Sequence, residues 1–92
     1  MLRTSPDAGR LLGELLEPLR AYDAERGSDL VTTLRTYVAC GFSPTRSAER
    51  LVVHPNTVLY RLRRVRELTG RDPQDPDDLV LLALALKQLD GL

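Results

Sequence analysis

The stretch TRSAERLVVHPNTVLYRLRRVRELTG, from Thr45 to Gly70, decides the fold of this chain. Apolar residues at helical spacing predict a short helix over residues 44–52 and a longer one over residues 55–69. Only residues 53–54 remain to connect the two helices. Such a tight connection, with the small Ala48 placed where the helices would cross, predicts a helix-turn-helix.

The longer helix has one apolar face and one polar face. An advance of about 100° per residue gathers four residues into a buried stripe: Val58, Leu62, Val65 and Thr69. The opposite face carries Asn56, Tyr60, Arg63 and Arg64. Gly70 follows as a residue type that commonly ends a helix. We therefore expect the helix to rest on a core with its apolar side and to leave its polar side open.

Helix start and stop signals precede this stretch. Ser5 as N-cap and Pro6 at the first helical position predict a first helix. Pro18 is expected to end that helix or to begin a second short one, because proline lacks a backbone N–H. Ser28 is expected to cap the next helix, over residues 29–40.

Helix start signals also precede the helix-turn-helix and the last helix. Ser43 is expected to cap the first helix of the pair, whose apolar side is predicted to include Leu51 and Val52. Asp75 as N-cap, followed by Pro76, predicts a final helix that is apolar almost all the way round.

The composition fits a single all-α domain. Ninety-two residues leave room for one core, and with no Trp and one Phe that core depends on Leu, Val and Ala. We predict a compact helical bundle of about five helices that contains the helix-turn-helix. No apolar run approaches the roughly 20 residues of a membrane span and no signal peptide is recognisable, so a cytoplasmic protein with no membrane partner is expected. With Cys40 as the only Cys, we expect no metal site and no cofactor.

Charge is sorted along the chain although the total is zero. Residues 35–66 carry seven Arg against one Glu, a net charge of +6, and four of these Arg fall within the six residues RLRRVR. Residues 1–34 carry −2 and residues 67–92 carry −4. This sorting favours an anionic partner for the central segment.

A DNA duplex is the partner that best fits a basic helix-turn-helix, because its second helix can enter the major groove. The residues expected to face the bases are Pro55, Asn56, Leu59, Tyr60 and Arg63. Asn56 can read adenine, Arg63 can read guanine and Leu59 can touch a thymine methyl group. The residues expected to lie along the phosphate backbone are Thr57, Arg61, Arg64 and Arg66, with Arg46 and Arg50 from the preceding helix.

Other interpretations of the same residues exist. An Arg-rich face is often only solvated surface, and helix-turn-helix geometry also occurs in proteins that bind no DNA. His54 is expected to be a turn residue near a phosphate or a structural residue, because no second His is present to make it a metal or catalytic site. The sequence contains no nucleophile and base pair, no paired carboxylates and no phosphate-binding Gly loop. Nothing in it therefore indicates an enzyme. The main alternative is a helical protein-interaction or dimerisation module that uses the apolar last helix.

Three blocks of the sequence resemble the C-terminal helix-turn-helix domain of PucR-type bacterial transcriptional regulators, the group that includes CdaR-like sugar-diacid regulators. The blocks are YDAERGSDLVTTLRTY, A..L.VHPNTV.YRLRR and ELTGRDPQDPDD, where a dot stands for a position outside the match, and the resemblance covers about Leu16 to Leu86. It implies DNA binding as the output of a longer regulator with an upstream regulatory domain. By position it maps the recognition helix onto His54, Asn56, Thr57, Tyr60, Arg61, Arg63 and Arg64. Leu59 departs from the basic or polar residue often found there, so base preference is expected to differ.

The resemblance also suggests how the chain divides. Residues 1–16 are expected to form an N-terminal helical extension or linker, and residues 17–92 the DNA-binding domain.

In the final helix a stripe of four residues can face the core: Leu79, Leu82, Leu86 and Leu89. Val80, Leu81 and Leu84 fall on other sides and still need cover. We therefore expect them to form a homodimer interface or to contact an upstream domain.

Overall fold

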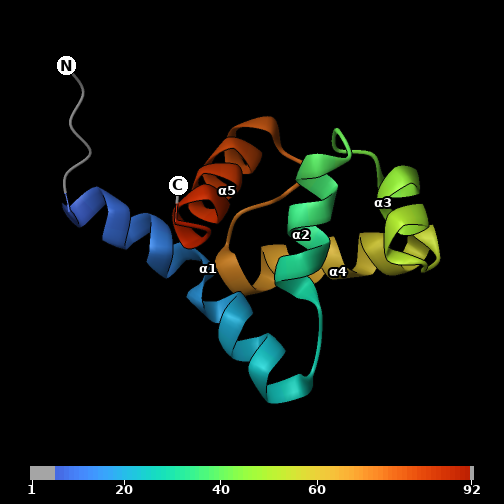
Figure 1. Cartoon of the computed structure of the whole chain (residues 1–92), viewed down its shortest axis with the longest axis horizontal. Helices are drawn as coiled ribbons and strands as arrows, with labels where there is room; N and C mark the ends of the chain where they lie inside the picture. Colours follow the sequence, from blue (N-terminus) through green and yellow to red (C-terminus); the bar gives the residue numbers. More distant parts are fainter. Residues whose placement is uncertain (1–5, 92) are drawn as a thin grey trace.

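The computed structural model describes residues 6–91, with side chains from residue 10 onward, and within these residues it contains five helices and no strand. The helices are α1 (Pro6–Arg26), α2 (Leu30–Ala39), α3 (Pro44–Leu51), α4 (Pro55–Thr69) and α5 (Pro76–Leu89). Figure 1 shows α2, α3 and α4 grouped together, with α1 and α5 beside one another toward the other end. The predicted all-α bundle is confirmed.

The expectation that Pro18 would end the first helix is wrong, because α1 continues through it from Pro6 to Arg26. Proline removes the hydrogen bond to the carbonyl of Glu14, but both residues are exposed, so water can take the place of the missing donor. Leu16 and Leu19, on either side, are completely buried in the core and hold the helix together across the gap. The predicted cap, Ser5, lies outside the described residues.

The division expected between residues 16 and 17 falls inside α1. Leu12 and Leu15, on the N-terminal side of that boundary, pack against the core together with the buried Leu16. The most extensive contacts of α1 are with α5. The first half of α1 therefore covers part of the last helix.

The expectation that Ser28 caps α2 is also wrong. Asp29 occupies the N-cap position and its side chain makes no capping hydrogen bond. The carboxylate of Asp23, still on α1, accepts from the backbone N–H groups of Leu30 at 2.9 Å and Val31 at 3.0 Å. Ser28 donates its hydroxyl to the same carboxylate. A residue of the preceding helix thus fixes the start of α2.

The helix-turn-helix forms as predicted from α3 and α4. Ser43 caps α3 by accepting from the backbone N–H of Arg46 at 3.2 Å. Ala48 is buried, and its carbonyl accepts from the N–H of Val53 at 3.0 Å, which closes the turn. Val53 is half-buried against the core.

Val52 does not join the apolar side of α3, contrary to expectation. It is the C-cap residue, with a left-handed φ of 57°, and its side chain is 87% exposed. The chain must reverse direction within two residues before α4, and this turn directs Val52 to solvent. Leu51 and Val53 contact the core in its place.

The apolar stripes of α4 and α5 agree with the sequence pattern. Val58, Leu62 and Val65 are buried, and α4 ends at Gly70, whose φ of 75° suits glycine. On α5 the predicted stripe of Leu79, Leu82 and Leu86 is buried in the core with Leu89 partly buried, and Ala85, which was not predicted, is buried beside them. Asp75 caps α5 by accepting from the N–H of Asp78 at 3.0 Å. Among residues 6–91 no helix is both long and apolar enough to cross a membrane.

Candidate DNA interface

The polar face of α4 lies on the surface, as its spacing predicts. Asn56 and Arg63 are exposed and Tyr60 is 50% exposed. The other residues expected to face the bases, Pro55 and Leu59, are partly buried, as is Thr57, which was expected along the phosphate backbone. The predicted base-reading residues therefore lie within the first nine residues of α4, with Asn56, Tyr60 and Arg63 most open.

His54 sets the start of this helix. It is the N-cap residue of α4, and its ring nitrogen Nδ1 accepts from the backbone N–H of Asn56 at 3.0 Å. This contact requires the tautomer that carries its proton on Nε2. His54 is thus a structural residue of the turn, one of the two roles expected for it, and it fixes where the exposed face of α4 begins. The part of the chain with described side chains contains no group of three His, Cys, Asp or Glu residues that could hold a metal ion.

Several arginines around this face have no carboxylate partner within the described part of the chain. Arg46 on α3 and Arg63 and Arg66 on α4 are exposed, and none of them forms an ion pair there. Arg50 is exposed as well and donates to the sulfur of Cys40 at 3.8 Å. Unpaired guanidinium groups on two adjacent helices are suited to bind phosphates.

Two of the predicted backbone-contacting arginines are held by the protein itself. Arg61 donates from Nη1 to the hydroxyl of the buried Thr33 on α2, at 3.1 Å. Arg64 donates from Nη2 to the hydroxyl of Tyr60 at 3.0 Å and lies 3.6 Å from a carboxylate oxygen of Glu67. The Tyr60 hydrogen bond, followed by the Glu67 carboxylate, raises the pKa of Arg64 above its usual value.

The loop between α4 and α5 adds residues that the sequence did not indicate. Leu59, Arg63 and Arg66 line one side of a hollow of about 380 Å³, and Asp72 and Gln74 line the other. The carboxylate of Asp72 accepts from the backbone N–H of Gln74 at 2.9 Å, which shapes this loop. Helical periodicity cannot predict such a loop contact, because the loop has no repeating pattern.

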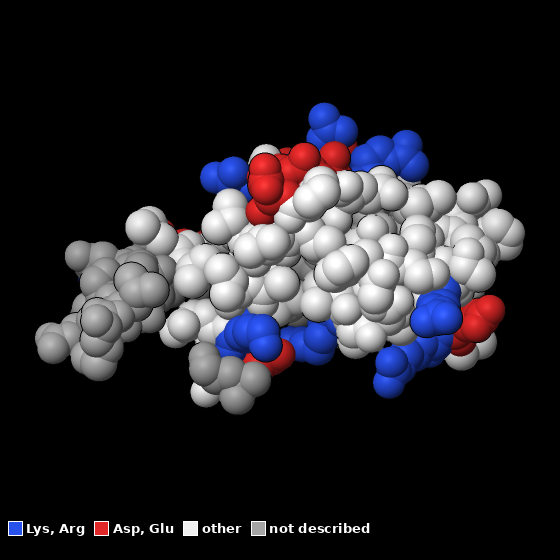
Figure 2. Space-filling view, turned by 90° about the horizontal axis from the view of Figure 1, so that it is seen from above, with Lys and Arg blue, Asp and Glu red and all other residues white. Residues whose placement is uncertain are grey.

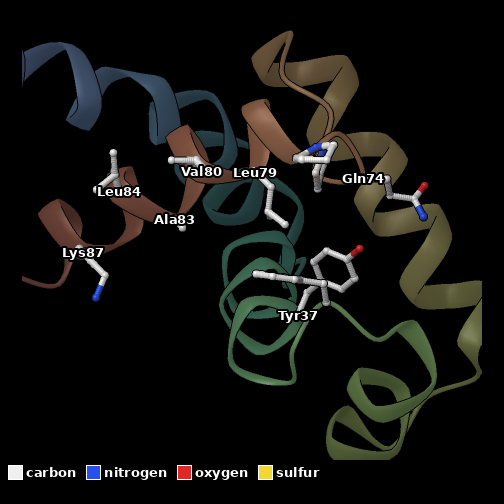
Figure 3. A pocket seen from close by; sticks show the side chains of 10 residues that line it. Tyr37, Gln74, Leu79, Val80, Ala83, Leu84 and Lys87 are labelled. Carbon is white, nitrogen blue, oxygen red and sulfur yellow. The ribbon is translucent and has the colours of Figure 1, made fainter.

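A second hollow lies beside α5. It has a volume of about 460 Å³, and its largely apolar lining is Tyr37, Phe42, Pro73, Gln74, Pro76, Leu79, Val80, Ala83, Leu84 and Lys87. Figure 3 shows Leu79 pointing from α5 toward Tyr37 on α2, with Leu84 and Lys87 further along α5. We call this hollow the α5 groove.

Of the three residues expected at a dimer interface, two line the α5 groove and one does not. Val80 is 60% exposed and Leu84 is 45% exposed, and both line the groove. Leu81 is partly buried and is not among the lining residues. Figure 2 views the molecule from above Figure 1, where α5 and the α2–α3 turn lie, and shows a face whose middle has few charged side chains.

Known proteins resemble this chain over most of its length. The purine catabolism regulatory protein of Bacillus subtilis (strain 168) is 35% identical over 89 residues, which are 95% of this chain and 17% of that protein. The carbohydrate diacid regulator of Escherichia coli (strain K12) is 40% identical over 78 residues, which are 84% of this chain and 20% of that protein. The chain thus spans a fifth or less of the length of the curated relatives that it matches.

A solved structure supports the same relationship. The crystal structure of a regulator of polyketide synthase expression from Bifidobacterium adolescentis matches with a TM-score of 0.68 and 41% sequence identity, over 70% of this chain and 25% of that chain. Residues 30–88, which contain α2, α3, α4 and all of α5 except its last residue, match the family model of the PucR C-terminal helix-turn-helix domain. Such domains belong to transcriptional regulators, and the family implies DNA binding and regulation. The chain belongs to the PucR C-terminal helix-turn-helix domain family.

Proposed function

We propose that this chain binds double-stranded DNA sequence-specifically, with the N-terminal half of α4 in the major groove, as the output domain of a bacterial transcriptional regulator. The observation that carries the proposal is the exposed face of Asn56, Tyr60 and Arg63, flanked by arginines on α3 and α4 that form no ion pair with the described residues. Arginine and asparagine can both form bidentate contacts with base edges. A face that only contacts water would not need base-reading side chains flanked by arginines. Binding to chromosomal DNA would place the chain in the cytoplasm.

In this proposal the exposed arginines have two different roles, base reading and phosphate contact. Arg63, next to Tyr60 on the open face, reads a base, whereas Arg46, Arg50 and Arg66 contact phosphates on either side. The partly buried Leu59 supplies an apolar contact with a thymine methyl group. Pro55 and Thr57 begin the helix at the point where it approaches the backbone.

The proposal includes a homodimer, because a single helix contacts too few base pairs to select one site in a genome. The apolar α5 groove, with the exposed Val80 and Leu84, supports α5 as the contact between two copies. A two-fold axis would set two copies of α4 on one side of the duplex, about 34 Å apart or a multiple of it. In a longer regulator an upstream regulatory domain would then control this pairing.

A selection of bound sequences from a random duplex pool tests the proposal. We expect enrichment of one motif with an inverted repeat, and binding that weakens steeply as salt is raised. Binding of all sequences alike would reject specific recognition. Enrichment of a motif without a repeat would reject the two-fold arrangement but keep base reading by α4.

The second candidate is a protein-interaction module that uses the α5 groove and binds no DNA. The exposed apolar side chains Val80 and Leu84 favour it, since such a patch on a small domain often marks a contact surface. Absence of any salt-dependent affinity for duplex DNA would support this candidate over the first.

A further inference from the structure

Four side chains from two helices form a continuous row that the sequence did not suggest. The guanidinium carbon of Arg26 lies 5.1 Å from the centre of the Tyr22 ring. The guanidinium carbon of Arg64 lies 5.7 Å from the centre of the same ring and 5.6 Å from that of Tyr60. We call Arg26, Tyr22, Arg64 and Tyr60 the cation–π ladder. It joins the C-terminal half of α1 to the middle of α4.

The surroundings of Arg64 differ from those of its neighbour Arg63. Arg63 is exposed, whereas the side chain of Arg64 keeps 32% of its accessible surface. The Nε atom of Arg64 is buried and has no hydrogen-bond partner within the described residues. The rest of its guanidinium contacts the two rings, the Tyr60 hydroxyl and the Glu67 carboxylate. A guanidinium engaged in this way is directed at the protein rather than at a phosphate.

Tyr60 lies one turn after Asn56 on the exposed face of α4. A half-exposed tyrosine on a helix surface can adopt several rotamers. If binding requires only one of them, the loss of the others on binding lowers the affinity. The hydrogen bond from Arg64 and the contact with its guanidinium restrict Tyr60 to one of these. Tyr22 restricts Arg64 from the other side.

We propose that Arg64 is a positioning residue, which is held by Tyr22 of α1 and in turn fixes Tyr60 for contact with DNA. This inference rests on the proposed function of α4. In this inference Arg64 acts through Tyr60 and does not contact a phosphate. Helix α1 then contributes to recognition through Arg64, without touching the duplex.

The salt dependence of binding separates the two roles. Loss of a phosphate contact lowers the slope of log affinity against log salt by about one and weakens all sequences alike. Loss of a positioning residue leaves the slope unchanged and weakens only the specific site. Arg64→Lys adds a second distinction, because lysine can still neutralise a phosphate but cannot reproduce the planar contacts with two rings.

The experiment measures affinity for the selected duplex and for a random duplex over a range of salt, with circular dichroism melts to confirm that each variant is folded. Tyr22→Leu should weaken specific binding about 3-fold, and Arg64→Lys and Arg64→Ala about 10-fold, all with the parental slope and parental random binding. Tyr22→Phe keeps the ring, and no hydrogen bond of the Tyr22 hydroxyl is among the described contacts, so this matched control should bind like the parent.

Two results would overturn the inference in different ways. A lower slope in Arg64→Ala, together with parental binding by Arg64→Lys and Tyr22→Leu, would make Arg64 a phosphate contact while α4 remained the reading helix. A parent chain that binds no duplex would reject the proposed function and the inference together. If Tyr22→Leu does not fold, Arg64→Lys decides the question, because it leaves α1 unchanged.

Discussion

The start of α2 offers a sharp test of the fold, because its capping residue comes from another helix. Asp23→Ala removes the acceptor for the backbone N–H groups of Leu30 and Val31, which lie 2.9 and 3.0 Å from its carboxylate. Loss of one capping bond typically costs about 1 kcal/mol, and hydrogen bonds to a charged group cost more. Asp23 also lies near the C-terminal end of α1, where a negative charge is unfavourable by roughly 0.3–1 kcal/mol.

The hydrogen bonds outweigh this repulsion, so Asp23→Ala should lower the free energy of unfolding by about 2 kcal/mol. For a chain of this length that corresponds to a Tm lower by roughly 8–16 °C. Urea unfolding followed by circular dichroism measures the first quantity and a thermal melt the second. Ser28→Ala and Asp29→Ala are the controls, since Ser28 only donates to Asp23 and the Asp29 side chain makes no cap. The reasoning is refuted if either control costs as much as Asp23→Ala.

Three further predictions concern the turn, the last helix and the surface. Ala48→Leu should cost about 1–3 kcal/mol of stability by overpacking a buried site, and DNA binding should fall with it; normal urea unfolding would contradict this. A hydrogen bond from the backbone N–H of Asp72 lowers the pKa of Asp78 below its usual 3.8. The charged carboxylate of Asp78 therefore stabilises the fold above pH 3.8, and this stabilisation is lost as the pH falls through the lowered pKa of the folded state. Asp78→Asn should therefore reduce stability near neutral pH and flatten its decline below about pH 4, as acid unfolding curves would show. Val80→Glu with Leu84→Glu should convert a dimer to a monomer in light scattering without unfolding it, since both residues are exposed, and a parent that is already monomeric at high concentration would reject the proposed interface for this chain.

Much of the fold follows from local patterns. The stripe of Val58, Leu62 and Val65 has the spacing of a helix that rests on a core, and the structure places it there. Ser43 and Asp75 cap the helices that they were predicted to cap, because an N-cap acts on backbone groups within three residues of itself. Such short-range signals survive folding unchanged.

The failures of prediction have long-range causes. Pro18 is a strong local break signal, but tertiary packing of Leu16 and Leu19 overrides it. Ser28 occupies a plausible cap position, yet the carboxylate of Asp23 reaches the same N–H groups from seven and eight residues earlier. No periodicity relates residues at such separations when a turn lies between them.

The candidate site shows the same division. Helical spacing was enough to predict that Asn56, Tyr60 and Arg63 share an exposed face. It did not separate Arg63 from Arg64, although Tyr60 and Glu67, one turn before and after Arg64, are partners within α4 itself. The contact between Tyr22 and Arg64 spans two helices and depends on how α1 crosses α4.

The most direct test of α4 as a reading helix compares two arginines on the same helix, Arg63 and Arg66, on the selected duplex and on random duplex. Both are exposed and neither forms an ion pair within the described part of the chain, so each serves as a control for the other. Arg63→Ala should weaken specific binding by about 1–3 kcal/mol and leave random binding unchanged, whereas Arg66→Ala should weaken both alike and lower the salt slope by about one. If both variants bind specific and random duplex as the parent does, α4 does not read DNA through this face.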